Sequence, residues 1–379
     1  MIDPYLIALL AAALAASFVS FRLGVSVAIA EIVMGMLLGS VPGLSPAGHD
    51  WLPFLAGLGS LFLTFLAGAE IDPDAFRARW KASTLIGVAS FGAPFLGAWW
   101  FSEGFLGWTR AASLLAGVAL STTSVAVVYV VLVETGLTST PAGKLILSSC
   151  FVTDLGTAVA LSVLFIPPNG LILLTFAGLG VSVVAVPRLL DWFLSRFREG
   201  VGQMELKMLL LMVLLLGLSA EVGGSHGVLP AYVVGLIAAR TFQGHRGVLL
   251  RLRGLTFALL TPFFFLHAGL NVSLAAVAAN LGLLGLLFGV KVGAKFAGVL
   301  PLARRYLPKD AIYATLLMST GLTFGTISST YGLQAGIVSR EQFSVLVTAV
   351  LLTAIVPTLV AQRWYTPDRE GSPERAGAP

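Results

Sequence analysis

Residues 143–166 read GKLILSSCFVTDLGTAVALSVLFI, an apolar run long enough to cross a lipid bilayer as one helix. One carboxylate, Asp154, lies close to the centre of this run. An ionisable side chain at that depth costs at least roughly 2.5–3.5 kcal/mol on insertion scales, so it usually marks a substrate or ion path. The alternative is a structural aspartate tied to a buried lysine or arginine. Asp154 is therefore the centre of the predicted site.

The composition is that of a polytopic membrane protein. Hydrophobic residues make up 57% of the 379 residues and charged residues only 11%, too few to cover the surface of a soluble domain of this length. The 42 glycines are typical of transmembrane helices that pack closely. One cysteine, Cys150, excludes an internal disulfide, and the four histidines lack metal-ligand spacing, so no metal site is predicted.

Long apolar runs alternate with charged or Pro/Gly-rich breaks along the whole chain. Their lengths predict an all-α fold with thirteen transmembrane helices. We expect residues 1–365 to form one transmembrane domain and residues 366–379 a short polar tail. The predicted spans are 4–20, 24–40, 51–70, 82–101, 111–133, 142–166, 170–194, 205–221, 226–242, 254–270, 275–300, 310–331 and 341–363.

The basic residues predict the orientation of these spans. With the N-terminus outside, nineteen of the 23 lysines and arginines fall on the inner side, against only Arg110 and Arg340 outside. The remaining two, Lys291 and Lys295, stay within the membrane. Positive charge concentrates in cytoplasmic loops, so the formal charge of +5 reports topology rather than nucleic-acid binding. We expect a multi-pass protein of the cell's inner membrane with its C-terminus in the cytoplasm.

Thirteen spans fit two six-helix halves of opposite orientation joined by a linker helix at 170–194. Inverted repeats of this kind place the transport site where interrupted helices meet at the midplane. The fifth span of each half contains a cluster of weak helix formers. In the first half these are Ser121, Thr122, Thr123 and Ser124, within AGVALSTTSVAVVYVVL. In the second half they include Gly321, Thr323 and Gly325, within LLMSTGLTFGTISSTYGL.

These two clusters can be read in two ways. They predict a pair of broken helices that cross beside Asp154, because both occupy the same repeat position. The alternative is a packing seam of small residues whose hydroxyls bond back to their own helix. Two clusters in matching positions beside a buried carboxylate favour the crossed, discontinuous helices.

Three further charged residues within predicted spans are candidates for the site. Lys291 and Lys295 are one helical turn apart on one face of LFGVKVGAKFAGVL. Lys291 is the deeper of the two and the better candidate to pair with the Asp154 neighbourhood, whereas we expect Lys295 to extend toward the cytoplasmic headgroups. Glu31, in VAIAEIVMGMLLG, has no partner in view and is a secondary candidate.

The residue types favour transport over catalysis. A carboxyl group in apolar surroundings can take up a proton near neutral pH, and it can instead coordinate a small cation together with hydroxyls and backbone carbonyls. A group that holds either a proton or a cation, never both, is the minimal chemistry of exchange. The sequence has no phosphate-cradling glycine loop, nucleophile elbow or acid pair, so neither an enzyme nor a cofactor is predicted.

Four segments give the chain a family resemblance. They are EIVMGMLLGS at 31–40, LFLTFLAGAEID at 61–72, ALSTTSVAV at 119–127 and FFFLHAGLNVSL at 263–274. In this order and spacing they resemble sodium/hydrogen exchangers of the bacterial monovalent cation:proton antiporter superfamily, which includes Nap- and Kef-type transporters. The resemblance covers nearly all of residues 20–363.

This resemblance implies a homodimer in which a core domain moves like an elevator against a dimerisation domain. It implies that Asp154 matches the family's ion-binding aspartate. Thr123 and Ser124 match the hydroxyls of the first broken helix, and Lys291 matches the lysine of the core domain. The implied partners are monovalent cations, protons, the lipid bilayer and a second copy of the chain, with no nucleic acid.

Two positions depart from the family pattern. Thr153 stands where relatives have the first member of an Asp-Asp or Asn-Asp pair, and a threonine cannot carry a second proton or charge. The second broken helix lacks the Arg-Gly-Glu run of some branches. We therefore expect one-for-one, electroneutral exchange, with Thr153, Thr123 and Ser124 helping Asp154 to coordinate the cation.

The predicted function is exchange of Na⁺ or K⁺ for H⁺ by alternating access. One alternative is a sodium-coupled symporter of an organic anion, but Asp154 would repel the anion and neither broken helix supplies an arginine. Another is a K⁺ efflux channel-like component, which would dissipate a cation gradient without moving protons. The choice between Na⁺ and K⁺ stays open, because selectivity depends on carbonyl geometry rather than on residue type.

Overall fold

The computed structural model of the chain describes residues 3–23, 27–41, 49, 51–70, 73–137, 140–165, 171–196, 203–222, 228–365 and 367. Within these residues every regular element is a helix. Eight helical segments among them are long and apolar enough to cross a membrane. The prediction of an all-helical membrane protein is therefore confirmed. The predicted tail at 366–379 lies outside the described residues, apart from position 367.

Helices also lie at the five predicted spans that are not among these eight. The predicted total of thirteen spans therefore stays a prediction. These helices are α2 (Val27–Gly39), α6 (Arg110–Ser121) with α7 (Val125–Glu134), α9 (Leu171–Arg196), α10 (Met204–Val222) and α11 (Val228–Gly244).

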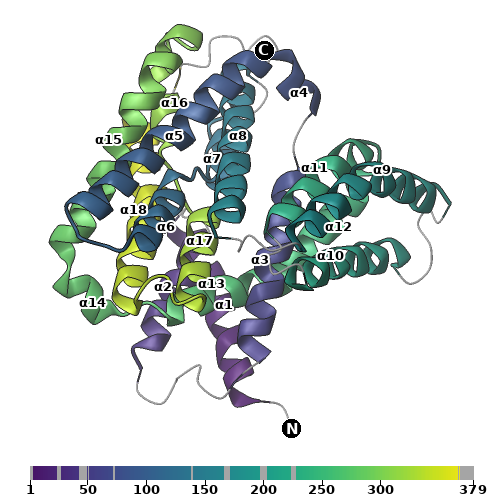
Figure 1. The fold of residues 1–379 in the computed structure, drawn as a ribbon, viewed down its shortest axis with the longest axis horizontal. Coiled ribbons are helices and arrows are strands. Elements are labelled where there is room, and N and C mark those ends of the chain that lie inside the picture. The colour runs from purple at the N-terminus through teal and green to yellow at the C-terminus, as the bar shows by residue number, and fades with distance from the viewer. Residues whose placement is uncertain are drawn as a thin grey trace, which may run out of the picture.

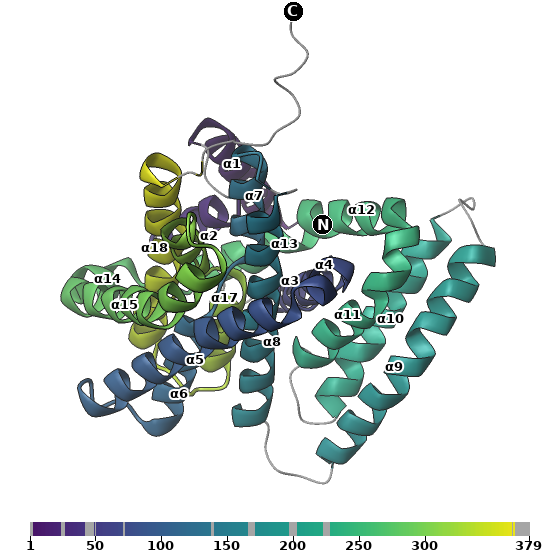
Figure 2. The same ribbon diagram turned by 90° about the horizontal axis from the view of Figure 1, so that it is seen from above.

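The helices form two units. In the first, the scaffold unit, α9 to α12 gather on one side of the molecule (Figures 1 and 2), and α3 packs along α11. The helices α1, α2 and α13 extend this unit through contacts with one another and with α3. Besides α2, α9, α10 and α11, it contains α1 (Pro4–Leu23), α3 (Trp51–Ala69), α12 (Arg246–Leu255), the π-helical turn η1 (Thr256–Leu260) and α13 (Thr261–Leu270).

The second, the core unit, lies on the opposite side in Figure 1. Its central helix is α5, which packs against α6, α8 and α15 and so brings three separate parts of the chain together. Besides α6 and α7, the unit contains α4 (Pro73–Ala78), α5 (Trp80–Gly104), α8 (Pro141–Phe165), α14 (Leu274–Ala279), α15 (Leu281–Tyr306), α16 (Ala311–Met318), α17 (Thr323–Gln334) and α18 (Arg340–Trp364).

The bounds predicted for two spans are wrong: the helical segment predicted at 254–270 begins at Arg246, and the span predicted at 275–300 is displaced along the chain. The short helix α14 ends before Asn280, whose side chain bonds back to the Ala276 carbonyl at 2.8 Å, and α15 starts at Leu281. Asparagine competes with the backbone for hydrogen bonds, so it favours a helix end over a helix interior. Because α15 then continues to Tyr306, both Lys291 and Lys295 lie near its middle.

Glycines let α2 and α13 touch through their backbones. A Cβ atom added at Gly269 would overlap the Ile32 carbonyl oxygen and lie 2.9 Å from the Cα of Gly35. A Cβ at Gly35 would in turn overlap the Leu266 carbonyl oxygen. Close approach through small residues is the main way in which transmembrane helices gain contact, because lipid is as apolar as their side chains.

We expect Gly269→Ala to destabilise the protein by about 1–3 kcal/mol, the range for overpacking a tight contact. The new methyl group meets backbone atoms, which cannot rotate away. Thermal unfolding in detergent, followed by the loss of the monodisperse chromatographic peak, measures the effect. Gly285→Ala is the matched control, since nothing lies within 4 Å of its added Cβ. Equal unfolding temperatures for the two variants would contradict the prediction.

Candidate functional site

Both predicted broken helices are interrupted, and the interruptions touch. Helix α6 ends at Ser121 and α7 begins at Val125, while α16 ends at Met318 and α17 begins at Thr323. Thr123 Oγ1 donates a hydrogen bond to the Met318 carbonyl at 2.9 Å. Hydroxyl-bearing and unwound segments are tolerated at membrane depth only where protein covers them, and every residue of the first interruption is buried.

The hydroxyls at the crossing do not all have the same role. Thr123 reaches across to the other interruption, and the amide of Ser124 lies 3.4 Å from Thr320 Oγ1. Ser124 Oγ also faces the Val127 amide at the start of α7, at 3.4 Å. The other hydroxyls bond back to their own helices, as the packing-seam alternative expects: Ser121 to Val118, Thr122 to Ala119, Ser319 to Thr315 and Thr320 to Leu317.

Glycines of the second interruption allow the two broken helices to approach. A Cβ at Gly325 would lie 2.9 Å from the Ala119 carbonyl oxygen. A Cβ at Gly321 would lie 2.8 Å from Thr122 Oγ1 and would overlap the ammonium group of Lys291. Thr323 is the first residue of α17 and is only partly buried. The crossing therefore depends on Gly321 and Gly325 more directly than on Thr323.

Lys295 joins α15 to the first interruption. It is fully buried, and its Nζ donates to Ser90 Oγ on α5 at 2.7 Å and to Thr123 Oγ1 at 2.9 Å. The expectation that Lys295 extends to the headgroups is wrong, because α15 continues to Tyr306 and places this residue at mid-helix. These two hydrogen bonds tie the side chain of Thr123 to α15 and, through Lys295, to α5.

Lys291 is also fully buried but makes no such bonds. Its Nζ has no hydrogen-bond partner among the described residues. It lies beside Gly321 and Thr122, directly at the crossing of the broken helices. The sequence predicts Lys291 as the functional lysine, with Lys295 as the alternative. The contacts bring both lysines to the crossing and leave the assignment of their roles as a prediction.

Asp154 lies deep within α8 and is 2% exposed. Its Oδ1 has no hydrogen-bond partner among the described residues. The charge of Lys295 acts on it, yet no ion pair within 4.0 Å joins Asp154 to either lysine in that part of the chain. One oxygen of this buried carboxylate is therefore available to bind a proton or to coordinate a small cation.

The neighbours of Asp154 on α8 face other helices. Thr153 Oγ1 lies 3.2 Å from the Gly87 carbonyl on α5 and 3.1 Å from the Ser149 carbonyl on α8. Its hydroxyl therefore donates to a backbone carbonyl of one of these two helices. Cys150 Sγ lies 3.5 Å from Met318 Sδ and links α8 to the second interruption. Glu31 is buried in α2 of the scaffold unit, and the described contacts do not bring it to Asp154.

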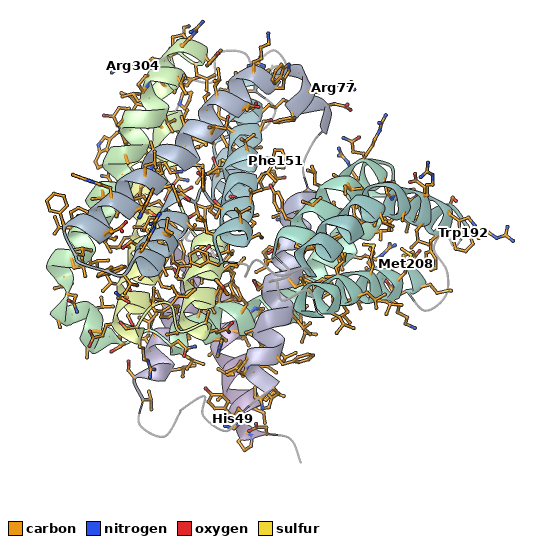
Figure 3. The ribbon with its side chains drawn as sticks, in the orientation of Figure 1. His49, Arg77, Phe151, Trp192, Met208 and Arg304 are labelled. Carbon is orange, nitrogen blue, oxygen red and sulfur yellow. The ribbon has the colours of Figure 1, made fainter. Side chains whose placement is uncertain are left out.

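Two residues of the site escape prediction from the sequence, Ser90 and Tyr232. Tyr232 of α11 donates from its hydroxyl to the Phe151 carbonyl at 3.1 Å, and its ring contacts Phe151 and Phe324 with centroid distances of 6.0 and 5.7 Å. Figure 3 shows Phe151 on α8, on the side toward the scaffold unit. Tyrosine is enriched at the membrane surface, so a tyrosine inside a predicted span, as Tyr232 is, could have indicated a role in the site.

We expect Tyr232→Ala to make Cys150 react severalfold faster with a membrane-permeant maleimide. The tyrosine hydroxyl donates to the carbonyl of Phe151, the residue next to Cys150, and the two rings stack. Cys150 is the one cysteine of the chain and is fully buried, so labelling reports this place alone. Tyr129→Ala, which removes an exposed ring of α7, is the control. Unchanged labelling would show that Tyr232 does not cover the site.

Comparison with known proteins decides the family. A profile described as "Sodium/hydrogen exchanger, transmembrane" matches residues 6–364. The chain belongs to the sodium/hydrogen exchanger family. This confirms the family predicted from the sequence, and with it the transport class of cation/proton exchange. Members of the sodium/hydrogen exchanger family are transporters rather than a class of enzymes.

Relatives of this sodium/hydrogen exchanger come from distant organisms. "Probable Na(+)/H(+) antiporter 3" of Methanocaldococcus jannaschii is 28% identical over 349 residues, covering 88% of this chain and 89% of the relative. "Cation/H(+) antiporter 18" of Arabidopsis thaliana is 29% identical over 378 residues, which cover 91% of this chain. The chain spans about half the length of the Arabidopsis relatives it matches, 46% in this case.

A solved structure shows the same fold. The sodium proton antiporter MjNhaP1 of Methanocaldococcus jannaschii superposes with a TM-score of 0.70. The match covers 96% of this chain and 98% of the other, at 12% sequence identity. The antiporter fold expected for the exchanger family is therefore present in this chain.

Proposed function

We propose that the protein exchanges a monovalent cation, Na⁺ or K⁺, for H⁺, and that Asp154 holds either the cation or the proton. The observation that carries this proposal is the unused oxygen of a buried carboxylate beside two interrupted helices. Sodium as cargo is supported by the names of the archaeal relative and of the solved antiporter. Hard monovalent ions prefer oxygen ligands, which the interruptions offer as hydroxyls and backbone carbonyls.

In this mechanism Thr123 is the best placed hydroxyl. It donates to the Met318 carbonyl and accepts from Lys295, so its oxygen is fixed at the crossing. We assign Lys295 the role of stabilising ionised Asp154 when no cation is bound, because the lysine charge acts on that carboxylate. Lys291, which lies beside Gly321, would offset the carbonyl-rich ends of α6 and α16.

The transport cycle needs the core unit to move against the scaffold unit. We propose thirteen spans arranged as two inverted six-helix repeats, since interruptions occur in the fifth span of each half. The N-terminus would lie outside and the C-terminus in the cytoplasm of the inner membrane, as the distribution of basic residues supports. A homodimer with the scaffold unit at its interface completes the proposal.

We propose one cation per proton. Thr153 occupies the position next to Asp154, and its hydroxyl interacts with backbone carbonyls of α5 and α8 rather than carrying charge. Exchange of one positive charge for another moves no net charge across the membrane.

Proton flux in proteoliposomes tests ion choice and coupling together. A cation gradient of Na⁺, then of K⁺, is imposed with the membrane potential either clamped or free, and a pH dye reports exchange. We expect a proton response to at least one cation that is equal in both potential conditions. Cation leakage without proton movement would indicate a channel and overturn the proposal. A response that depends on the potential would refute the one-for-one ratio alone.

A further inference from the structure

A basic pocket lies where three helices of the site end. It has a volume of about 290 Å³, and Arg79, Trp80, Lys81, Leu145 and Tyr306 line it. These residues belong to the start of α5, the start of α8 and the end of α15. Arg77 of α4 and Arg304 of α15 are each within two residues of a residue that lines the pocket. Figure 3 shows both at one end of the molecule, opposite His49.

The charge around this pocket is strongly positive. Arg79 and Lys81 line the pocket, are exposed and are two positions apart. Among the described residues at the neighbouring helix ends, Asp74, Glu134 and Asp310 are acidic. The other exposed basic residues at the same ends are Arg77, Lys144, Arg304, Arg305 and Lys309. An excess of like charge at this density repels itself, and an anion in the pocket would relieve that repulsion.

Aromatic rings place the pocket at the membrane surface. The ammonium of Lys81 lies 5.7 Å from the ring centre of Trp80, and the guanidinium of Arg305 lies 5.8 Å from that of Tyr306. Trp80 is 54% exposed. Tryptophan and tyrosine concentrate where lipid headgroups meet the apolar layer, and basic residues beside them contact headgroup phosphates.

An apolar stripe leads from the pocket along α5. Leu85 and Val88 follow Lys81 at helical spacings of four and seven residues, so all three share one face. Both apolar side chains are about half exposed, at 49% and 56%. A ligand with a phosphate at Lys81 and acyl chains along Leu85 and Val88 would fit this surface. A free phosphate ion would use only the basic end.

We propose that this pocket binds the phosphate headgroup of an anionic phospholipid in the cytoplasmic leaflet. The bound lipid joins the ends of α5, α8 and α15, the helices that carry Ser90, Asp154 and the two buried lysines. It thereby stabilises the arrangement of the transport site. This inference rests on the orientation given under the proposed function, which places these helix ends in the cytoplasm.

Lipid binding is tested with the whole protein and phosphatidylglycerol. Native mass spectrometry measures binding to the delipidated protein and to the double variant Arg79→Gln/Lys81→Gln. Each basic residue near an anionic surface contributes about 1 kcal/mol, so losing two should weaken binding about thirtyfold at 1.4 kcal/mol per tenfold. The double variant Arg22→Gln/Lys207→Gln removes two exposed cations of the scaffold unit and should bind as the wild type does.

Three outcomes would overturn the lipid site. Equal loss of binding in both double variants would show a diffuse charge effect, and unchanged binding would exclude the pocket. Competition by inorganic phosphate as strong as that by the lipid would show an ion site without acyl contacts. If the double variant is not monodisperse, Lys81→Gln alone serves, because the side-chain contact described for this lysine is with Trp80.

The lipid site and the transport activity can fail separately. Exchange assays in vesicles of phosphatidylcholine, with and without phosphatidylglycerol, accompany the binding measurement. Loss of binding in the pocket variant without any exchange by the wild type would refute the proposed function and leave the lipid site standing. Normal exchange by the wild type, together with lipid binding that is unchanged in the pocket variant, would refute the lipid site and leave the proposed function standing.

Discussion

Asp154→Asn is expected to abolish cation–proton exchange while the protein still folds. Asparagine has the shape of aspartate but can neither bind a proton and release it nor carry the charge that holds a cation. Because Oδ1 of Asp154 has no hydrogen-bond partner among the described residues, replacing the carboxylate breaks no bond at that atom. Lys295 loses the opposing charge but keeps its hydrogen bonds to Ser90 and Thr123, so we expect the variant to fold with at most a modest fall in unfolding temperature.

The measurement is dye-reported proton flux in proteoliposomes after addition of Na⁺ or K⁺. Chromatography and thermal unfolding confirm that equal amounts of folded protein are compared. Asp191→Asn is the matched control, because Asp191 is an exposed aspartate of α9 in the scaffold unit. We expect this variant to exchange cations for protons as the wild type does. Normal exchange by Asp154→Asn would refute the mechanism.

Lys295→Met is expected to have the second largest effect. The substitution removes the bonds to Ser90 and Thr123 and the positive charge that acts on Asp154. We expect loss of exchange together with reduced stability, since a buried carboxylate would remain without its cation. In the Asp154→Asn background the stability cost of Lys295→Met should be smaller by about 0.5–3 kcal/mol, the range for interacting residues.

A double-mutant cycle with Lys291 separates the two lysines. Lys291 lies one turn from Lys295 on the same helix and is equally buried, so it matches in size, depth and charge. Its coupling to Asp154 should be smaller, because Lys291 lies against Gly321, whereas Lys295 is bonded to Ser90 of α5, the helix that packs along α8. Thermal unfolding of the single and double variants gives both couplings. A larger coupling for Lys291 than for Lys295 would show that Lys291 is the partner of Asp154, as predicted from the sequence, and would refute the role proposed for Lys295.

The sequence was sufficient for the family, the membrane fold and the interrupted segments. Spans follow from apolar length, and the interruptions at Ser121 and Met318 follow from clustered weak helix formers. These are local properties of the chain. Asp154 was recognisable for the same reason, as a charge with no local compensation.

Side-chain partners could not be predicted in this way. Lys295 seemed close to a helix end only because Asn280 ends α14 and shifts α15 along the chain. Its bonds to Ser90 and Thr123 join helices that are far apart in sequence. Nothing in the neighbourhood of Ser90 distinguishes it from a packing serine, because its role comes from what α15 places opposite it.

The bond between Thr123 and the Met318 carbonyl has a consequence for biosynthesis. The two residues are 195 positions apart, so the first interruption is made long before its partner exists. Until α16 is inserted, the segment around Thr123 must meet its polar needs from water, lipid headgroups or the insertion machinery, because hydrocarbon offers none. The transport site should therefore assemble only after the C-terminal helices enter the membrane, and chains truncated before Met318 should be selectively degraded.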